Sequence, residues 1–199
     1  MQYINQLDYR HVIYHTKVKM EGVTKEDMLR NVARAGCGLC CACMAVDILT
    51  DKHLSIEESV IISEESLANH SVGTDMHVFG PAFSEKFGLS YSNTDSLDEA
   101  ISHLQAGGVI IAHVGVPIGE EIGLFTKKGH YILLVSTDGK EFCFLDPSYT
   151  TEKFKIPERA GKINEENAPF LYTDVFNVDN QIKPNKTKYH LFARKKIVL

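Results

Sequence analysis

Residues 36–50 read GCGLCCACMAVDILT, and this stretch decides how the rest of the chain must fold. Small and apolar side chains follow one another from Cys37 to Thr50 without a proline, which is typical of a buried helix. Four of the chain's five cysteines lie in this stretch, within a span of seven residues. We therefore expect a buried helix over about 37–50, with the other elements packed around it.

Helical patterns fill most of the remaining first half of the chain. Thr24 is an N-cap candidate for a short helix that ends near Arg30. Ser55, followed by Glu58, starts a second helix in the same way. Two more helices are expected: one that ends at Gly88 with a break or shift near Gly80–Pro81, and one that Ser96 caps and Gly107–Gly108 stops.

Runs of β-branched and aromatic residues predict strands mainly in the second half. Expected strands are residues 109–116, two runs from Gly129 to Pro147 joined by the turn TDGK, and a closing strand over 188–199. Part of the first 20 residues is also expected to be a strand, because apolar and polar side chains alternate there. Residues 155–188 read as an irregular insertion. Helices followed by strands indicate an α+β fold, with the cysteine-bearing helix packed against an antiparallel sheet.

Length and composition exclude several classes of protein. The 199 residues favour a single domain spanning 1–199, and the net charge of -5 with scattered basic residues argues against a nucleic-acid partner. The longest apolar run, Val109–Ile118, is shorter than the ~20 residues that a membrane helix needs, and the N-terminus has no signal-peptide pattern. An odd number of cysteines without paired spacing indicates reduced thiols and a cytoplasmic protein.

The cysteine cluster allows several interpretations. Cys37, Cys40 and Cys43 have the C-x2-C-x2-C spacing of an iron–sulfur site, but the ligands of such sites usually lie in open loops. A zinc ribbon would need a second pair of cysteines, and Cys143 is the only other cysteine outside the cluster. A thioredoxin-like C-x-x-C lacks the flanking strand. We interpret Cys40, Cys41 and Cys43 as small buried core residues.

Cys37 differs from the other cysteines because it lies where the helix should begin, between Gly36 and Gly38. The N-terminal end of a helix favours a thiolate and lowers the pKa of a cysteine there. The two glycines are expected to leave room for a substrate to approach the sulfur. The position predicts a nucleophile, which needs a histidine partner held by a third polar group.

Among nine histidines, His130 is the best candidate for that partner because it follows Gly129 and opens a strand, and Asp146 ends the next strand. A two-residue turn in TDGK would place His130 opposite Pro147. A type I turn with a G1 bulge at Gly139 would place it opposite Asp146, with the two Cβ atoms ~5 Å apart. We predict the bulged register because a Cys–His–Asp site needs it.

These motifs resemble those of a known family. GCGLCCACMAV resembles the CGP-x-x-x-x-M helix start of papain-like cysteine peptidases of the bacteriocin-processing (double-glycine leader peptidase) type, with Leu39 in place of the proline. GHYILLVSTDGKEFCFLDPS resembles that family's GH-strand-turn-strand-DP segment, and LDEAISHLQAGGVIIAHV resembles its preceding helix and strand. The resemblance covers roughly Arg30–Ser148 and implies a papain-like fold.

The resemblance also implies roles for individual residues. Cys37 would be the nucleophile, His130 the general base and acid, and Asp146 the residue that orients the imidazole. Asn31 stands where the family has a glutamine that donates to the oxyanion. An alternative alignment makes Cys40 the nucleophile, but it places Arg34 where the amide should be.

The expected activity is that of a cysteine hydrolase, a peptidase or amidase, that acts on a peptide or an amide-containing small molecule without a metal or an organic cofactor. An acyltransferase with the same triad is one alternative. A metal- or cluster-binding protein that uses the cysteine cluster is the alternative from another class.

Overall fold

The computed structural model describes residues 1–70, 72–181 and 189–195. Its helices are η1 (Gln6–Asp8, a 3₁₀ helix), α1 (Lys25–Met28), α2 (Val32–Ala35), α3 (Cys37–Leu49), α4 (Ile56–Glu65), α5 (Met76–Phe87), α6 (Leu97–Gln105) and α7 (Val175–Asp179). Its strands are β1 (Asn69–His70), β2 (Gly73–Thr74), β3 (Leu89–Thr94), β4 (Val109–Gly115), β5 (Gly129–Thr137), β6 (Glu141–Leu145), β7 (Leu171–Asp174) and β8 (Tyr189–Arg194).

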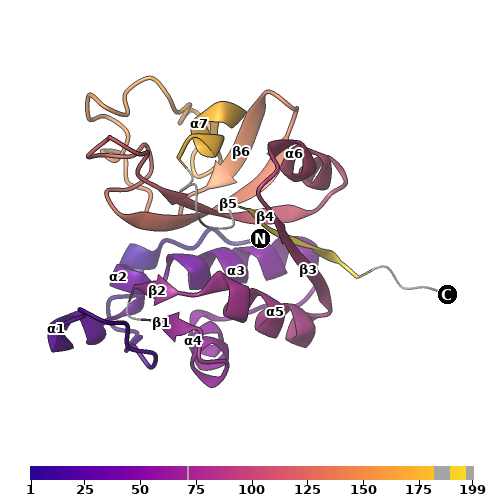
Figure 1. Cartoon of the computed structure of the whole chain (residues 1–199). Coiled ribbons are helices and arrows are strands. Elements are labelled where there is room, and N and C mark those ends of the chain that lie inside the picture. Colours follow the sequence, from indigo (N-terminus) through magenta and orange to yellow (C-terminus); the bar gives the residue numbers. More distant parts are fainter. Residues whose placement is uncertain (71, 182–188, 196–199) are drawn as a thin grey trace.

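The described residues form three layers around one antiparallel sheet with the strand order β3-β8-β4-β5-β6-β7. Figure 1 shows α3, α4 and α5 on one side of this sheet and α6 and α7 on the other. Each side has its own apolar core. Met44 and Phe79 pack with Leu133 on the α3 side, and Leu104 and Val178 pack with other strand residues on the α6 side. The predicted α+β architecture is confirmed.

The helix predicted over 37–50 is confirmed as α3, which ends at Leu49 with Thr50 as its C-cap. Its side chains from Leu39 to Val46 are all 0 % exposed. No polar face is needed because other elements cover the helix all round: α3 lies against β5 and β4 on one side and against α4 and α5 on the other.

The helix caps predicted at Ser55, Ser96 and Gly88 are present. The side chains of Ser55 and Ser96 accept hydrogen bonds from the N–H groups of Glu58 and Glu99, and Gly88 ends α5 at a left-handed φ of 71°. The break predicted near Gly80–Pro81 is wrong, because α5 runs through both residues.

Gly80 has a packing role in that continuous helix. A Cβ atom at this position would lie 2.6 Å from the ring of Tyr91. The glycine therefore lets α5 approach β3 closely, and it does not mark a helix break.

The strand predicted in the first 20 residues is wrong. This segment contains η1 and makes only isolated bridges, among them one between Ile13 and Asn31. It forms hydrogen bonds with the turn that follows β6. The Tyr3 hydroxyl donates to the carbonyl oxygen of Asp146, and the Gln6 N–H donates to the carbonyl oxygen of Pro147. These hydrogen bonds pair polar groups of the segment without adding it to the sheet, whose edge strands are β3 and β7.

Several elements were not predicted, among them β3, β7 and α7. The edge strand β3 has only two apolar positions in LSYSNT, so it lacks the composition of a strand. The strand β7 and the helix α7 both lie within 155–188, which corrects the expectation of an irregular insertion there. The last strand, β8, is not at an edge, because it pairs with both β3 and β4. The predicted end of that strand, 196–199, lies outside the described residues.

The buried His190 of β8 gives the first prediction. It is 1 % exposed, its Nδ1 lies 3.0 Å from the Tyr91 hydroxyl, and the ring of His77 lies 4.9 Å away. Burial, together with the nearby His77 and His113, lowers the pKa of His190 to about 3. The folded protein therefore keeps His190 neutral at pH values where the unfolded chain, with an ordinary pKa of ~6.5, takes up a proton.

Stability that depends on His190 is present above pH ~6.5 and is lost as the pH falls toward 3. Between pH 7 and pH 5 we expect His190 to account for a loss of about 2 kcal/mol in the free energy of unfolding. Urea unfolding at both pH values measures this loss, and His190→Gln should remove it. The exposed His53 supplies the control His53→Gln. Equal pH dependence in wild type and His190→Gln would contradict the prediction.

Candidate active site

Cys37 lies at the first position of α3 and is only half-buried, whereas Cys40, Cys41 and Cys43 are 0 % exposed. The backbone N–H groups of Gly38 and Tyr131 lower the pKa of its thiol. These donors and the helix N-terminus all favour negative charge on the sulfur. Cys40, the alternative nucleophile, is buried, and this burial raises its pKa well above the ordinary value.

The glycines on either side of Cys37 serve packing, which corrects the expectation that they open a path for substrate. A Cβ atom on Gly36 would lie 2.7 Å from the carbonyl oxygen of Val32. A Cβ atom on Gly38 would lie 3.2–3.3 Å from Met76, Thr74 and Tyr131. The glycines allow α2 to turn directly into α3, and they allow α3 to lie close to β5.

The β5–β6 hairpin has neither of the two registers considered from the sequence. Leu133 pairs with Leu145, Thr137 pairs with Phe142, and a bulge lies between Leu134 and Ser136. Asp138 instead stabilises a longer turn by accepting from the N–H groups of Lys140 and Glu141. The predicted G1 bulge is therefore wrong, although Gly139 does have the positive φ of 93° that was expected.

The observed bulge nevertheless brings His130 and Asp146 to the same face. Extending the Leu133–Leu145 register places Ile132 opposite Asp146, so His130 is its diagonal neighbour two residues away. Without the bulge the register would differ by one residue, and the two side chains would point to opposite faces. In the structure His130 Nε2 lies 2.8 Å from Asp146 Oδ1, and both side chains are buried.

Cys37 and His130 interact closely enough for each to shift the pKa of the other. Burial raises the pKa of the Cys37 thiol, but the hydrogen bond and the charge of His130 lower it more, so that it lies below its ordinary value. Burial and the charge of Lys153 lower the pKa of His130, while Asp146 and Cys37 raise it more, to a value above the ordinary one. The pair therefore favours thiolate and imidazolium. Because Asp146 engages Nε2, Nδ1 is the ring nitrogen left for the sulfur.

Two residues near Asp146 were missed by the sequence reasoning. Ser148 donates its N–H to Asp146 Oδ1 at 2.8 Å, and its Oγ lies 3.1 Å from the same oxygen and 3.2 Å from His130 Nε2. Lys153 donates from Nζ to Asp146 Oδ2 at 2.5 Å and to Ser148 Oγ at 2.7 Å. In the sequence Lys153 is one of many scattered basic residues, and only its place after the Asp-Pro turn marks it.

Asn31, the expected oxyanion donor, has a structural role. Its Oδ1 caps α2 by accepting from the N–H of Arg34, and its Nδ2 donates to the carbonyl of Arg10 at 2.8 Å. The structure therefore joins Cys37, His130 and Asp146 but engages the amide of Asn31 elsewhere.

A second amide, that of Gln6, lies beside the start of α3. Its side chain is buried, and Nε2 donates to the carbonyl oxygen of Ala33 at 2.8 Å. In an uninterrupted helix that carbonyl would accept from the N–H of Cys37, four residues later. Gln6 Oε1 has no hydrogen-bond partner, and Nε2 carries a second hydrogen. Its position 31 residues before Cys37 gave no signal in the sequence.

The remaining cysteines do not converge on a common point. The Cys41 thiol donates to the carbonyl of Tyr131 and the Cys43 thiol to that of Ser55. Among residues 1–70, 72–181 and 189–195, no three or more His, Cys, Asp or Glu side chains are grouped so that they could hold a metal ion.

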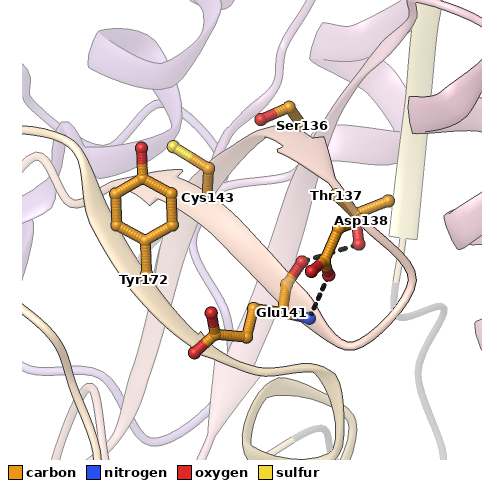
Figure 2. A pocket seen from close by; sticks show the side chains of 6 residues that line it. All are labelled: Ser136, Thr137, Asp138, Glu141, Cys143 and Tyr172. Carbon is orange, nitrogen blue, oxygen red and sulfur yellow. Dashed lines mark hydrogen bonds between the residues drawn. The ribbon is translucent and has the colours of Figure 1, made fainter.

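Cys143 lies away from the cluster, at the turn end of the β5–β6 hairpin. It lines a pocket of about 310 Å³ together with Ser136, Thr137, Asp138, Glu141 and Tyr172. Figure 2 shows its sulfur directed toward the Tyr172 hydroxyl. Six residues of β5 separate His130 from this end of the hairpin, which corresponds to ~20 Å. The pocket is therefore separate from the Cys37 site.

Comparison of the chain with models of known protein families and with curated proteins finds no match. In the part of the chain that the structure describes, every helix is too short or too polar to cross a membrane.

Proposed function

We propose that the protein is a single-domain, papain-like cysteine hydrolase of the cytoplasm that cleaves a peptide or amide bond through an acyl-enzyme. The observation that carries this proposal is that the half-buried Cys37 has its pKa lowered by His130, whose imidazole lies 2.8 Å from the Asp146 carboxylate. A nucleophile, a base within hydrogen-bond reach and a third group that orients the base are the parts that such catalysis requires.

In the acylation step the Cys37 thiolate attacks the carbonyl carbon of the substrate. The tetrahedral intermediate collapses as His130 gives its proton to the leaving amine, and the C–N bond breaks. The acyl group then remains on Cys37 as a thioester. Asp146 keeps the imidazole in the tautomer and orientation that this transfer needs.

In the second step His130, now neutral, removes a proton from water, which attacks the thioester and releases a carboxylic acid and the Cys37 thiolate. An acyltransferase would use an amine in place of this water molecule. The same side chains serve both reactions, so product analysis distinguishes them.

The oxyanion of each tetrahedral intermediate is bound by the backbone N–H of Cys37 at the start of α3. Because Asn31 is engaged with Arg10 and Arg34, we assign the second donor to the free amide hydrogen of Gln6. The support for this assignment is the hydrogen bond of Gln6 to the carbonyl of Ala33, four residues before Cys37.

Alkylation of the native protein with iodoacetamide at pH 6 tests the proposal. Cys37 should react at least ~10-fold faster than each other cysteine, because the thiolate is the reactive form. Cys143 is the informative reference thiol, since burial raises its pKa and no histidine partner is found among its hydrogen bonds. Peptide mapping by mass spectrometry measures the five rates. Equal, slow labelling of all five would overturn the proposal.

A panel of aminoacyl and peptidyl amides then tests turnover. The hydrolase is expected to give free acid and an acyl adduct on Cys37 that mass spectrometry detects, whereas an acyltransferase would give product only with added amine. Cys37→Ala should abolish both adduct and product.

A further inference from the structure

A buried lysine completes the contacts of the Asp146 carboxylate. The side chain of Lys153 is 9 % exposed and that of Asp146 is 0 % exposed, and Nζ lies 2.5 Å from Oδ2. The other carboxylate oxygen, Oδ1, accepts from His130 and Ser148. Each oxygen therefore faces a different partner: Oδ1 faces the imidazole and Oδ2 the ammonium group.

Ser148 links these partners. Its hydroxyl accepts from Lys153 at 2.7 Å, and it lies within hydrogen-bond distance of both Asp146 Oδ1 and His130 Nε2. The ammonium group is thus one hydroxyl away from the imidazole. At such a distance, and shielded from solvent, its charge acts on the protonation of His130.

We propose that Lys153 is a positioning residue of this site, whose ammonium group is the permanent counter-ion of Asp146 and leaves His130 free to exchange its proton with the substrate. The inference rests on the proposed function. Without Lys153, the only charge that could balance the buried carboxylate would be an imidazolium, and His130 would be held in its protonated form. With Lys153 present, the charge of the carboxylate is partly balanced, so that Asp146 orients the ring and raises the pKa of His130 less than it would alone.

The chain after Asp146 holds Lys153 in this place. Phe154 is buried in the core on the α6 side, and the Lys153 ammonium lies 5.6 Å from the centre of its ring. Arg159 is also buried; it donates to the carbonyl of Lys153 at 3.1 Å and to that of Gly123 at 3.0 Å. Arg159 thus joins Lys153 to the segment that leads into His130. Arg159 contributes to the site through this link.

The charges around His130 agree with this role. Lys153 lowers the pKa of His130 while Asp146 and Cys37 raise it, and Lys153 also lowers the pKa of Asp146. In a variant without Lys153, the charge of His130 still faces Asp146 and favours its ionised form. Removing Lys153 should raise the pKa of His130 and leave Asp146 charged.

The test is an NMR titration of the His130 imidazole in the full chain, which needs no substrate. Lys153→Met keeps the apolar stem and removes the charge, and it should shift the His130 titration upward by about one pH unit. Lys153→Gln keeps a neutral N–H donor and should show the same upward shift. Lys153→Arg keeps the charge and should restore the wild-type titration. Lys155→Met is the matched control, because Lys155 is exposed and pairs with Glu152.

Two outcomes would overturn the inference: a titration in Lys153→Met that matches that of Lys155→Met, or a wild-type titration in Lys153→Gln. If Lys153→Met does not fold, Lys153→Gln and Lys153→Arg together still decide whether the charge matters. The alkylation experiment on Cys37 tests the hydrolase itself, so failure of the proposed function and failure of the role of Lys153 are observed separately.

Discussion

Replacing His130 by alanine is expected to lower turnover of an amide substrate by about 10²- to 10⁴-fold, the usual contribution of a general acid and base. The same change should slow alkylation of Cys37 at pH 6 by at least ~10-fold. The reason is that His130 is the strongest of the groups that lower the pKa of this thiol, through its hydrogen bond and its charge. Alkylation should not stop, because the N–H groups of Gly38 and Tyr131 remain.

The pH dependence makes this prediction specific. At pH values well above the ordinary thiol pKa of ~8.5 the variant also forms the thiolate, so the difference in alkylation rate between wild type and His130→Ala should shrink as the pH rises. His53→Ala is the matched control: His53 also lies 3.0 Å from an aspartate, Asp47, but its side chain is 63 % exposed. Unchanged alkylation at pH 6 in His130→Ala would show that the imidazole does not activate Cys37.

Replacing Asp146 by alanine is expected to destabilise the folded protein by about 3–5 kcal/mol, because the change leaves the buried Lys153 without its counter-ion. Urea unfolding at pH 7 measures this loss. Asp146→Ala combined with Lys153→Met should recover much of it, since the double variant buries no unpaired charge. Glu152→Ala breaks an exposed ion pair with Lys155 and should have almost no effect. A double variant no more stable than Asp146→Ala would contradict this explanation.

Acid unfolding offers a second measurement of the same interaction. Burial raises the pKa of Asp146, but Lys153 and His130 hold it well below the usual range. A carboxylate with a lowered pKa in the folded state contributes stability above its unfolded pKa of ~3.9, and this stability is lost as the pH falls below that value. The wild type should therefore lose stability below pH ~4 more steeply than Asp146→Ala.

The local parts of this protein follow from its sequence. The mostly small and apolar side chains of 37–50, without a proline, predict a buried helix because such a segment can only be stable when other elements cover it, and α3 is that helix. Ser55, Ser96 and Gly88 act as caps for reasons that lie within one helical turn. The choice of Cys37, His130 and Asp146 also depended on local signals, namely a helix start and the two ends of a hairpin.

Interactions between distant segments could not be predicted in this way. The polar edge strand β3 exists because β8 pairs with it, about 100 residues later in the chain. The hairpin register depends on a bulge near Val135 that no turn residue announces, and a shift of one residue would have separated His130 from Asp146. The sequence therefore identified both residues, but only the sheet determined that they meet.

The position of Lys153 behind Asp146 is a further feature that only the folded chain determines. A lysine in a sequence has the appearance of a surface residue, and only the folded chain shows that Lys153 is buried against Asp146. The sequence by itself determined the buried helix and the residue that begins it. The tertiary structure alone decided how His130 is charged and oriented, because burial, register and a counter-ion seven residues beyond Asp146 are properties of the packed chain.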